Sequence, residues 1–252
     1  MPISKAKTKY IHALKLKKYR DEHQCFIAEG RKLISELLPF FHCQTLIRTN
    51  ETFKQEKTAT IDEIININSN EELKDLSTLT TPPSAIAIFK MPQKQVILDS
   101  LANDITLMLD NVQDPGNLGT IIRTANWFGI KRIICSRGCA DIYNPKVVQA
   151  TMGAIAHVDI VYSDLTTILN HCKSNNIAIY GTQLNGKNIY ETSLTPGIII
   201  MGNEGNGISE ETAAYIDHAL LIPHYQNEYV IDSLNVAIAT AITCAEFRRR
   251  GI

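Results

Sequence analysis

The chain has 252 residues, of which 44% are hydrophobic and 20% are charged. This ordinary globular composition excludes a disordered, collagen-like or disulfide-dense secreted protein. The 25 basic and 26 acidic residues give a net charge of −1, so the total charge provides no argument for binding a polyanion.

The charge is, however, distributed unevenly along the chain. Residues 1–32 hold nine basic and three acidic residues, a net charge of +6 that leaves −7 for the rest. Such asymmetry indicates a basic surface that meets a polyanion, mounted on a neutral-to-acidic body. A solvated lysine-rich helix would have the same composition and is the alternative.

Two features bear on location and metal binding. No apolar run approaches the roughly 18 residues that span a bilayer, and no signal-peptide core follows the basic start, so we expect a cytoplasmic protein. The six cysteines are scattered, and only Cys135 and Cys139 lie close together. Because no second pair has metal-ligand spacing, we predict no metal site and no catalytic thiol.

The first part of the chain is predicted to form a small substrate-binding domain. Glu29–Gly30 reads as a turn after a short strand, and Thr81-Pro82-Pro83 is a strong break. The expected elements are a basic helix, a strand, a second helix and a later strand, over 5–18, 25–28, 31–38 and 85–89. We place a domain over residues 1–90 and a polar linker over 91–103.

Residues 104–252 show a different pattern, in which apolar strands alternate with helices. This alternation predicts an α/β domain with a mostly parallel sheet. The expected strands are 105–109, 132–135, 157–162, 177–180, 198–201 and 219–222, with helices starting near Asn117, Pro145, Leu165, Ser209 and Asn235. Ligands of such sheets bind outside the carboxyl ends of the strands, so the loops after Leu109, Met201 and Ile222 are the places to look for chemistry.

The loop after Leu109 leads into a helix for which Asn117 is a suitable N-cap and Gly129 a suitable end. Arg123 lies off the apolar stripe of this helix, in its second turn. Helical side chains lean toward the N-terminus, so the guanidinium can reach back over the loop and hold a phosphate or another anion. A surface arginine beside a structural cap is the alternative.

The loop after Met201 contains three glycines in six residues, Gly202 to Gly207, which allows its backbone to approach a ligand closely. It matches neither the dinucleotide fingerprint nor the phosphate-binding loop. Glu204 and the acidic start of the next helix would repel a pyrophosphate. The loop therefore favours a ligand with hydroxyls, an amine or a positive centre.

The loop after Ile222 ends in Ser233-Leu234-Asn235, and Ser233 or Asn235 alone would be interpreted as a helix cap. The helix that follows is rich in alanine, which allows another backbone to approach closely. It ends in three arginines, which are favourable at a helix C-terminus.

The three loops together resemble the SpoU class of the SPOUT methyltransferases, which methylate RNA ribose 2′-hydroxyls. The resemblance rests on motifs that occur in the family's order: Asn117-x-Gly119-x-x-x-Arg123, Gly202-Asn203-Glu204-Gly205-x-Gly207-Ile208-Ser209, and Ile222-Pro223 with Ser233-Leu234-Asn235-Val236-Ala237. It extends over about residues 104–250, including 144–153. Phe26-x-x-Glu29-Gly30 resembles the ribosomal-protein-like substrate-binding domain that often precedes this catalytic domain.

The resemblance implies a deep trefoil knot, an exception to the rule against knotted chains. It also implies a homodimer and the cofactor S-adenosyl-L-methionine, bound largely by backbone groups. The cofactor positions carried over are Gly202, Ile222 and Leu234, with Thr182 as a further contact. One departure is the segment between Pro223 and Ser233, whose nine residues contain no glycine, whereas relatives have a shorter segment with glycine.

The implied chemistry is methyl transfer from a sulfonium to a hydroxyl, which needs in-line alignment and a group that receives the proton. The family pattern places five residues around the reacting oxygen: Arg123, Asn117, Glu204, Ser233 and Asn235. Because a guanidinium stays protonated in proteins, it is a poor proton acceptor. Our hypothesis is that Arg123 grips the target phosphate and stabilises the oxyanion, while Glu204 or a water takes the proton.

Three functions are compatible with these features. The first is an RNA ribose 2′-O-methyltransferase that binds rRNA, or less commonly tRNA, through its basic N-terminal domain. The second is a non-catalytic RNA-binding or ribosome-assembly factor that retains the fold. The third is an unrelated small-molecule enzyme, which would leave the basic N-terminal module unexplained. The preference for rRNA rests on analogy with two-domain members of the class.

Overall fold

The computed structural model describes residues 3–49, 53, 58–93, 101–225 and 233–252. The chain divides into two compact units, which we describe separately. Unit 1 comprises Met1–Gln93 and Asp141–Ala156, and unit 2 comprises Lys94–Ala140 and His157–Ile252. Across these described ranges, no helix is long and apolar enough to cross a membrane. The domain boundaries predicted from the sequence stay a prediction.

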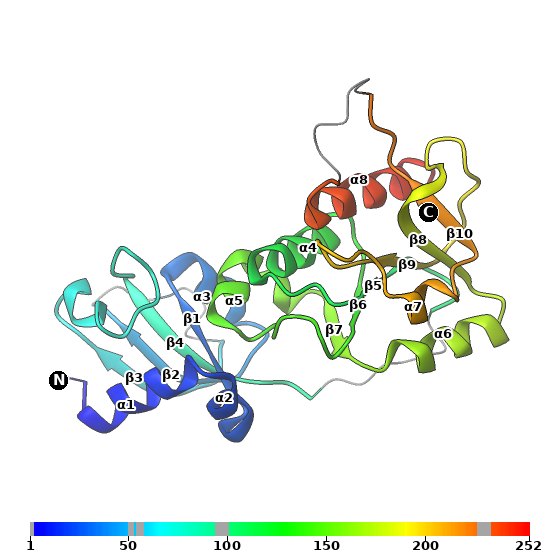
Figure 1. Ribbon diagram of the computed structural model, residues 1–252. Coiled ribbons are helices and arrows are strands. Elements are labelled where there is room, and N and C mark those ends of the chain that lie inside the picture. Colours follow the sequence, from blue (N-terminus) through cyan, green and yellow to red (C-terminus); the bar gives the residue numbers. More distant parts are fainter. Residues whose placement is uncertain (1–2, 50–52, 54–57, 94–100, 226–232) are drawn as a thin grey trace. The chain divides into compact units, whose positions relative to one another are not determined.

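Unit 1 is built on a four-stranded sheet in the order β1-β4-β2-β3 (Figure 1). Strand β4 pairs antiparallel with β1 and β2, and β2 pairs parallel with β3. The strands are β1 (Cys25–Glu29), β2 (Cys43–Arg48), β3 (Ile61–Asn66) and β4 (Ala85–Lys90). The α-helices are α1 (Lys5–Leu14), α2 (Lys17–His23), α3 (Arg31–Leu37) and α5 (Pro145–Thr151), with short 3₁₀ turns at Asn70–Leu73 and Ala154–Ala156.

Strand β1 is buried along its whole length because both of its faces are covered. Alternate side chains of a strand point to opposite faces. Ile27 joins a cluster that contains Ile11 and Leu14 of α1. On the other face, Phe26 packs against Tyr143, with ring centroids 4.8 Å apart. The segment 141–156 is thus part of the core of unit 1, although it lies between two strands of the other sheet in sequence.

The predicted basic helix over 5–18 is in fact two helices that break at Leu16, whose backbone is extended. A break frees backbone carbonyls at the end of the first helix. The guanidinium of Arg20 provides hydrogen bonds to these carbonyls. Its Nη1 donates to the carbonyls of Leu14 (3.0 Å) and Lys15 (2.8 Å). Its Nε donates to Asp141 Oδ2 at 3.2 Å, which ties the helix junction to the segment 141–156.

This buried cluster leads to a stability prediction. The Arg20 side chain is 2% exposed and that of Asp141 is 15% exposed. We expect Arg20→Ala to lower the free energy of unfolding by about 3 kcal/mol, because it leaves a carboxylate and two carbonyls without their partner. Urea unfolding followed by circular dichroism measures this loss. Lys17→Ala, at an exposed position of α2, is the control, and an equal effect of both variants would contradict the assignment.

Unit 2 contains a six-stranded sheet in the order β10-β8-β9-β5-β6-β7, in which every neighbouring pair is parallel. The predicted α/β class with a parallel sheet is therefore confirmed. The strands are β5 (Thr106–Leu109), β6 (Arg132–Cys135), β7 (Asp159–Tyr162), β8 (Ala178–Asn188), β9 (Gly197–Met201) and β10 (His218–Leu221). The helices are α4 (Pro115–Trp127), α6 (Leu165–Ser174), α7 (Glu210–Ala213) and α8 (Val236–Arg249).

The helices of unit 2 cover both faces of its sheet (Figure 1). Helices α4 and α8 pack together on one face, and α6 and α7 lie on the other. The second face buries a continuous apolar cluster in which Met108, Ile198 and Ile200 of the central strands meet Ile168 and Leu169 of α6. Burial on both faces explains why the central strands have continuous apolar sequences instead of alternating ones.

The end of α8 is organised around a carboxylate. Glu246 is 4% exposed and accepts hydrogen bonds from Arg249 Nε (2.7 Å) and Arg250 Nε (2.6 Å). The Arg249 guanidinium, with a further contribution from Arg250, lowers the pKa of Glu246 to about 2. The charged carboxylate therefore stabilises the fold above the pKa of the unfolded chain, and this contribution is lost as the pH falls toward 2.

We accordingly expect the free energy of unfolding to fall between about pH 5 and pH 2. The part due to Glu246 should be about 1–2 kcal/mol, because the exposed side chain of Arg249 is partly screened by solvent. Urea unfolding at a series of pH values measures it, and Glu246→Gln should flatten the curve. Glu210→Gln, at an exposed position of α7, is the matched control. A curve unchanged by Glu246→Gln would refute this account.

Candidate functional site

The three loops singled out in the sequence meet at the carboxyl ends of the strands of unit 2. Strands β5 and β9 are neighbours in register, with Leu109 opposite Met201, so the loops that follow them emerge side by side. Asn235, at the end of the third loop, meets Asn117 after the first loop through a hydrogen bond of 2.9 Å. Parallel strands bring their carboxyl ends to one edge, where ligands of α/β sheets bind.

The start of α4 differs from the sequence prediction. Asp114, not Asn117, is the N-cap: its Oδ1 accepts from the Asn117 N–H at 2.8 Å, and Pro115 occupies the first turn. Gly129, with φ +65°, follows the end of the helix as predicted. The signal that was missed is proline directly after a capping residue, since proline is favoured at the first helical position. The consequence is that the Asn117 side chain is free for other contacts.

Asn117 uses this freedom to connect the other two loops. Its Nδ2 donates to Glu204 Oε1 at 2.7 Å, and its Oδ1 accepts from Asn235 Nδ2 at 2.9 Å. Asn235 Oδ1 in turn caps α8 by accepting from the N–H groups of Ala237 (3.0 Å) and Ile238 (3.3 Å). Three predicted site residues, Glu204, Asn117 and Asn235, thus form one chain of hydrogen bonds, which we call the amide relay.

The donors and acceptors of the amide relay can be arranged in only one way. A carboxylate accepts hydrogen bonds and the N–H groups at the start of α8 donate them, so each asparagine must present its NH₂ toward Glu204 and its carbonyl toward α8. Within the described part of the chain, Glu204 Oε2 has no hydrogen-bond partner. The relay therefore fixes one oxygen of Glu204 and leaves the other available to a substrate.

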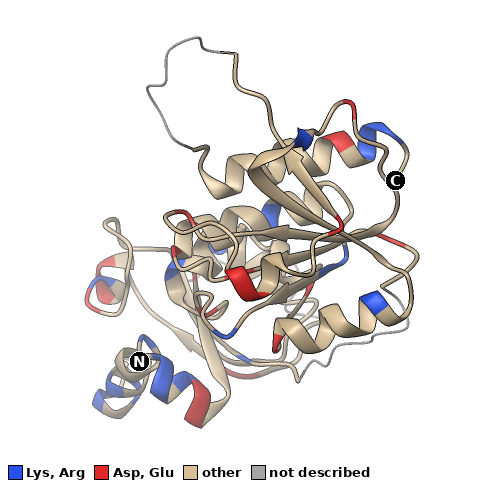
Figure 2. Cartoon of the chain, turned by 45° about the vertical axis from the view of Figure 1, so that its right-hand side comes forward, with Lys and Arg blue, Asp and Glu red and all other residues tan. Residues whose placement is uncertain are grey.

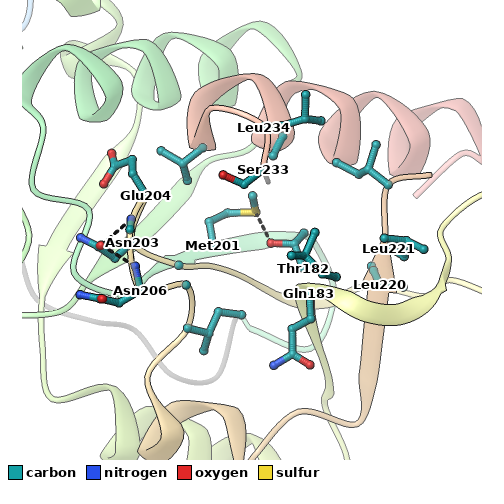
Figure 3. Close-up of a pocket in the computed structure, with 18 of the residues that line it drawn as sticks. Thr182, Gln183, Met201, Asn203, Glu204, Asn206, Leu220, Leu221, Ser233 and Leu234 are labelled. Carbon is teal, nitrogen blue, oxygen red and sulfur yellow. Dashed lines mark hydrogen bonds between the residues drawn. The ribbon is translucent and has the colours of Figure 1, made fainter. Parts of the chain in front are cut away.

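A pocket of about 500 Å³ lies beside the relay (Figure 3). All four predicted cofactor residues line it: Thr182, Gly202, Ile222 and Leu234. Two of the predicted catalytic residues, Glu204 and Ser233, line it as well. Its volume is within the range of ligand pockets, roughly 300–1,000 Å³.

One wall of the pocket comes from an irregularity in β8. The pairing of β8 with β10 jumps from Gly181 opposite Ala219 to Lys187 opposite Leu220, so the residues between leave the ladder. Four of these residues line the pocket: Thr182, Gln183, Leu184 and Asn185. The apolar pattern predicts that this strand ends at Tyr180, so it does not indicate the bulge, although Thr182 is one of the predicted cofactor residues.

The pocket fits a ligand that is held by backbone groups. Within the described residues, the backbones of Gly202, Ile222 and Leu234 take part in no hydrogen bond, so they are free to bind a ligand. A Cβ at Gly202 would lie 2.3 Å from the carbonyl carbon of Gly207, which shows how closely this backbone is packed. The nearby Glu204 carboxylate favours a positively charged ligand. These features suit S-adenosylmethionine, which carries a sulfonium and an amino group.

Arg123 is placed differently from the other predicted residues. It lies in α4, is exposed, and makes no hydrogen bond or ion pair within the described part of the chain. Among the described residues, no hydrogen bond or ion pair therefore joins Arg123 to Asn117, Glu204, Ser233 or Asn235. Ser233 is likewise exposed, although it lines the pocket.

Three polar residues of the same region, Asp110, Asn111 and Asn203, are not among the site residues predicted from the sequence. Asp110 is 3% exposed, and its Oδ2 accepts from the N–H (2.9 Å) and hydroxyl (2.7 Å) of Ser209, the N-cap of α7. Asn203 Nδ2 donates to the carbonyl of Asn111 at 2.8 Å. The available signal was the excess of Asn and Asp directly after β5 and β9.

The cysteines are all unpaired and buried. Burial raises the pKa of most of these thiols, but a hydrogen bond from Cys135 lowers the pKa of Cys139 to about 7. Within the described ranges, no group of His, Cys, Asp or Glu side chains could hold a metal ion.

Two family models match the chain. One, described as the SpoU rRNA Methylase family, covers residues 104–245, and the other, an MRM3-like substrate binding domain, covers residues 5–87. The 23S rRNA (guanosine(2553)-2′-O)-methyltransferase RlmP of Bacillus subtilis is 30% identical over 239 residues, which are 93% of each chain. The mitochondrial rRNA methyltransferase 3 of Xenopus laevis is 32% identical over 65% of this chain and 41% of its own length.

Solved structures of RNA methyltransferases are also similar to this chain over nearly its whole length. A Porphyromonas gingivalis protein assigned to the TrmH family of RNA methyltransferases is 40% identical, with a TM-score of 0.88 and 98% of each chain covered. The AdoMet-bound rRNA methyltransferase from Sinorhizobium meliloti is 29% identical, with a TM-score of 0.83, 97% of this chain and 95% of that one covered. The chain belongs to the SpoU rRNA methylase family.

Proposed function

We propose that this protein transfers the methyl group of S-adenosyl-L-methionine to the ribose 2′-hydroxyl of a nucleotide in structured rRNA. The observation that carries the proposal is the junction of a cofactor-sized pocket with the amide relay. Glu204 belongs to both, because it lines the pocket and accepts from Asn117. A methyl donor and a proton-accepting carboxylate are thereby brought to the same place.

The residues have distinct roles in this reaction. The bound cofactor supplies an electrophilic methyl group on a sulfonium. Asn117 and Asn235 hold Glu204, whose free Oε2 receives the proton of the 2′-hydroxyl, directly or through a water. Ser233 lies on the pocket wall, where its hydroxyl orients the ribose. Fixing the hydroxyl in line with the methyl group removes much of the entropic barrier.

Arg123 has a binding and electrostatic role in this proposal. Its guanidinium is exposed and has no carboxylate partner among the described residues, so it can take an RNA phosphate in a bidentate arrangement. Its positive charge also stabilises the oxygen as negative charge develops during proton loss. In this proposal, the phosphate of the bound RNA holds the Arg123 guanidinium close to the reacting 2′-hydroxyl.

RNA binding by unit 1 follows from its charge. Lys and Arg residues are concentrated on the two N-terminal helices (Figure 2). Helices α1 and α2 present exposed lysines at positions 5, 9, 17 and 18. Contacts from such residues to phosphates supply affinity without sequence information, and the reacting 2′-hydroxyl distinguishes RNA from DNA.

Three further predictions belong to the same proposal. We propose a homodimer through α4 and α8, which pack together and expose Trp127 (84%) and Ile238 (53%). A trefoil knot in the catalytic domain remains an expectation from the family resemblance, and a cytoplasmic location remains an expectation from the sequence. The segment 226–232, which holds most of the lengthened third loop, lies outside the described residues.

Calorimetric titration with S-adenosylmethionine tests the proposal first. We expect saturable binding to the purified protein and none to Leu234→Arg, because the larger charged side chain would occupy the pocket that Leu234 lines. The substrate for the activity assay is rRNA extracted from cells that lack the protein. We then expect the wild-type protein to methylate this rRNA and Leu234→Arg not to. If the wild-type protein binds no cofactor, with or without RNA, the alternative of a non-catalytic RNA-binding factor gains support.

A further inference from the structure

Asn111, the second residue after β5, has a backbone conformation that is uncommon for a non-glycine residue, with φ +57°. Neighbouring groups hold it there. Its N–H donates to Ser136 Oγ at 2.9 Å, and its Nδ2 donates to Asp110 Oδ1 at 2.9 Å. A Cβ at Gly138 would lie 1.8 Å from Asn111 Oδ1, so the side chain fits only because position 138 is glycine.

This conformation directs the Asn111 carbonyl toward the glycine-rich turn. The carbonyl accepts from Asn203 Nδ2 at 2.8 Å, while Asn203 Oδ1 accepts from the N–H groups of Gly205 (2.8 Å) and Asn206 (3.1 Å). The Asn203 amide is therefore used at both ends. Two backbone hydrogen bonds between Asn203 and Gly207, of 2.8 and 3.0 Å, close the turn.

Glu204 lies inside this closed turn, directly after Asn203 (Figure 3). The segment after β5 thus holds the turn at two points. Asn111, in the loop, fixes the base of the turn through Asn203, and Asn117, in the first turn of α4, fixes the Glu204 carboxylate. The contact at Asn203 limits movement of the turn, and the contact at Glu204 limits rotation of its carboxylate, so both contribute to directing the free oxygen of Glu204.

We infer that Asn111 and Asn203 are positioning residues that set the direction of the Glu204 carboxylate for proton transfer. The inference rests on the proposed function, because it takes Glu204 as the proton acceptor. Misplacing a reacting group by about 1 Å can lower a rate roughly a hundredfold, so loss of this link should lower kcat while RNA affinity changes little. The strained backbone at Asn111 is consistent with a functional constraint at this position.

Two pairs of variants separate this role from simple structural support. Asn203→Asp keeps the oxygen that accepts from Gly205 and Asn206 but loses the donor to Asn111, whereas Asn203→Ala loses both. Asn111→Gly removes the side chain but tolerates positive φ, whereas the β-branched Asn111→Val does not. The measurement is kcat and the KM for rRNA at saturating S-adenosylmethionine, with circular dichroism to verify folding.

We expect Asn203→Asp and Asn203→Ala each to lower kcat by at least about tenfold, with the KM for rRNA within about threefold of wild type. Asn111→Gly should retain most of the activity and Asn111→Val little of it. Wild-type kcat in Asn203→Asp would overturn the inference, even if Asn111→Val fails to fold. Absence of methyl transfer by the wild type itself would instead contradict the proposed function.

Discussion

Replacing Gly202 with alanine is expected to lower the affinity for S-adenosylmethionine by roughly a hundredfold, because forced overpacking costs about 1–3 kcal/mol and each 1.4 kcal/mol is a factor of ten. The added Cβ would lie 2.3 Å from the carbonyl carbon of Gly207 and 2.4 Å from the nitrogen of Ile208. Both are backbone atoms, so a side-chain rotation cannot relieve the clash. The turn that lines the pocket would have to move.

The comparison for this prediction is Gly205→Ala in the same turn. A Cβ there would lie 3.5 Å from Asn203 Oδ1, an ordinary contact, so the turn can keep its conformation and a measurable affinity. Calorimetry gives both dissociation constants, and thermal unfolding shows whether each variant remains folded. Equal loss of affinity in the two variants would show that the close backbone packing at Gly202 is not what shapes the pocket.

Much of unit 2 could be predicted because its signals are local. Buried parallel strands are short apolar runs, and all six were found, with boundaries within two residues except for the far end of β8. The pocket residues followed from the family motifs. The geometry of the candidate site did not, because the amide relay joins side chains 87 and 118 positions apart in the sequence. Only the folded chain shows that Asn117 serves both partners.

Unit 1 was harder to predict, for two physical reasons. Strand β3 has little apolar periodicity because most of its side chains are exposed, and the sequence analysis did not identify it or β2. The sequence predicts one continuous domain over 104–252, which stays a prediction, and does not indicate that the segment 141–156 packs with unit 1. Hydrophobic pattern shows that Val147 and Val148 are buried, but it does not show against which sheet.

Glu204→Gln is expected to lower kcat by about 10²–10⁴-fold, the usual contribution of a general base. The substitution is nearly isosteric, and the amide oxygen of glutamine can still accept from Asn117 Nδ2, so the relay should persist. We therefore expect the KM for rRNA and the affinity for S-adenosylmethionine to change little. Single-turnover methyl transfer to unmodified rRNA separates the chemical step from product release.

Arg123→Lys completes the test, because it shows whether Glu204 or Arg123 accepts the proton of the 2′-hydroxyl. If Arg123 binds phosphate and stabilises the oxyanion, lysine should raise the KM for rRNA and lower kcat by a factor that is nearly independent of pH, because a point charge replaces a bidentate fork. If Arg123 were the base, the more easily deprotonated lysine would regain activity as the pH rises. Near-complete recovery at high pH, together with an active Glu204→Gln, would assign the proton to Arg123 and leave Glu204 as a structural anchor of the turn.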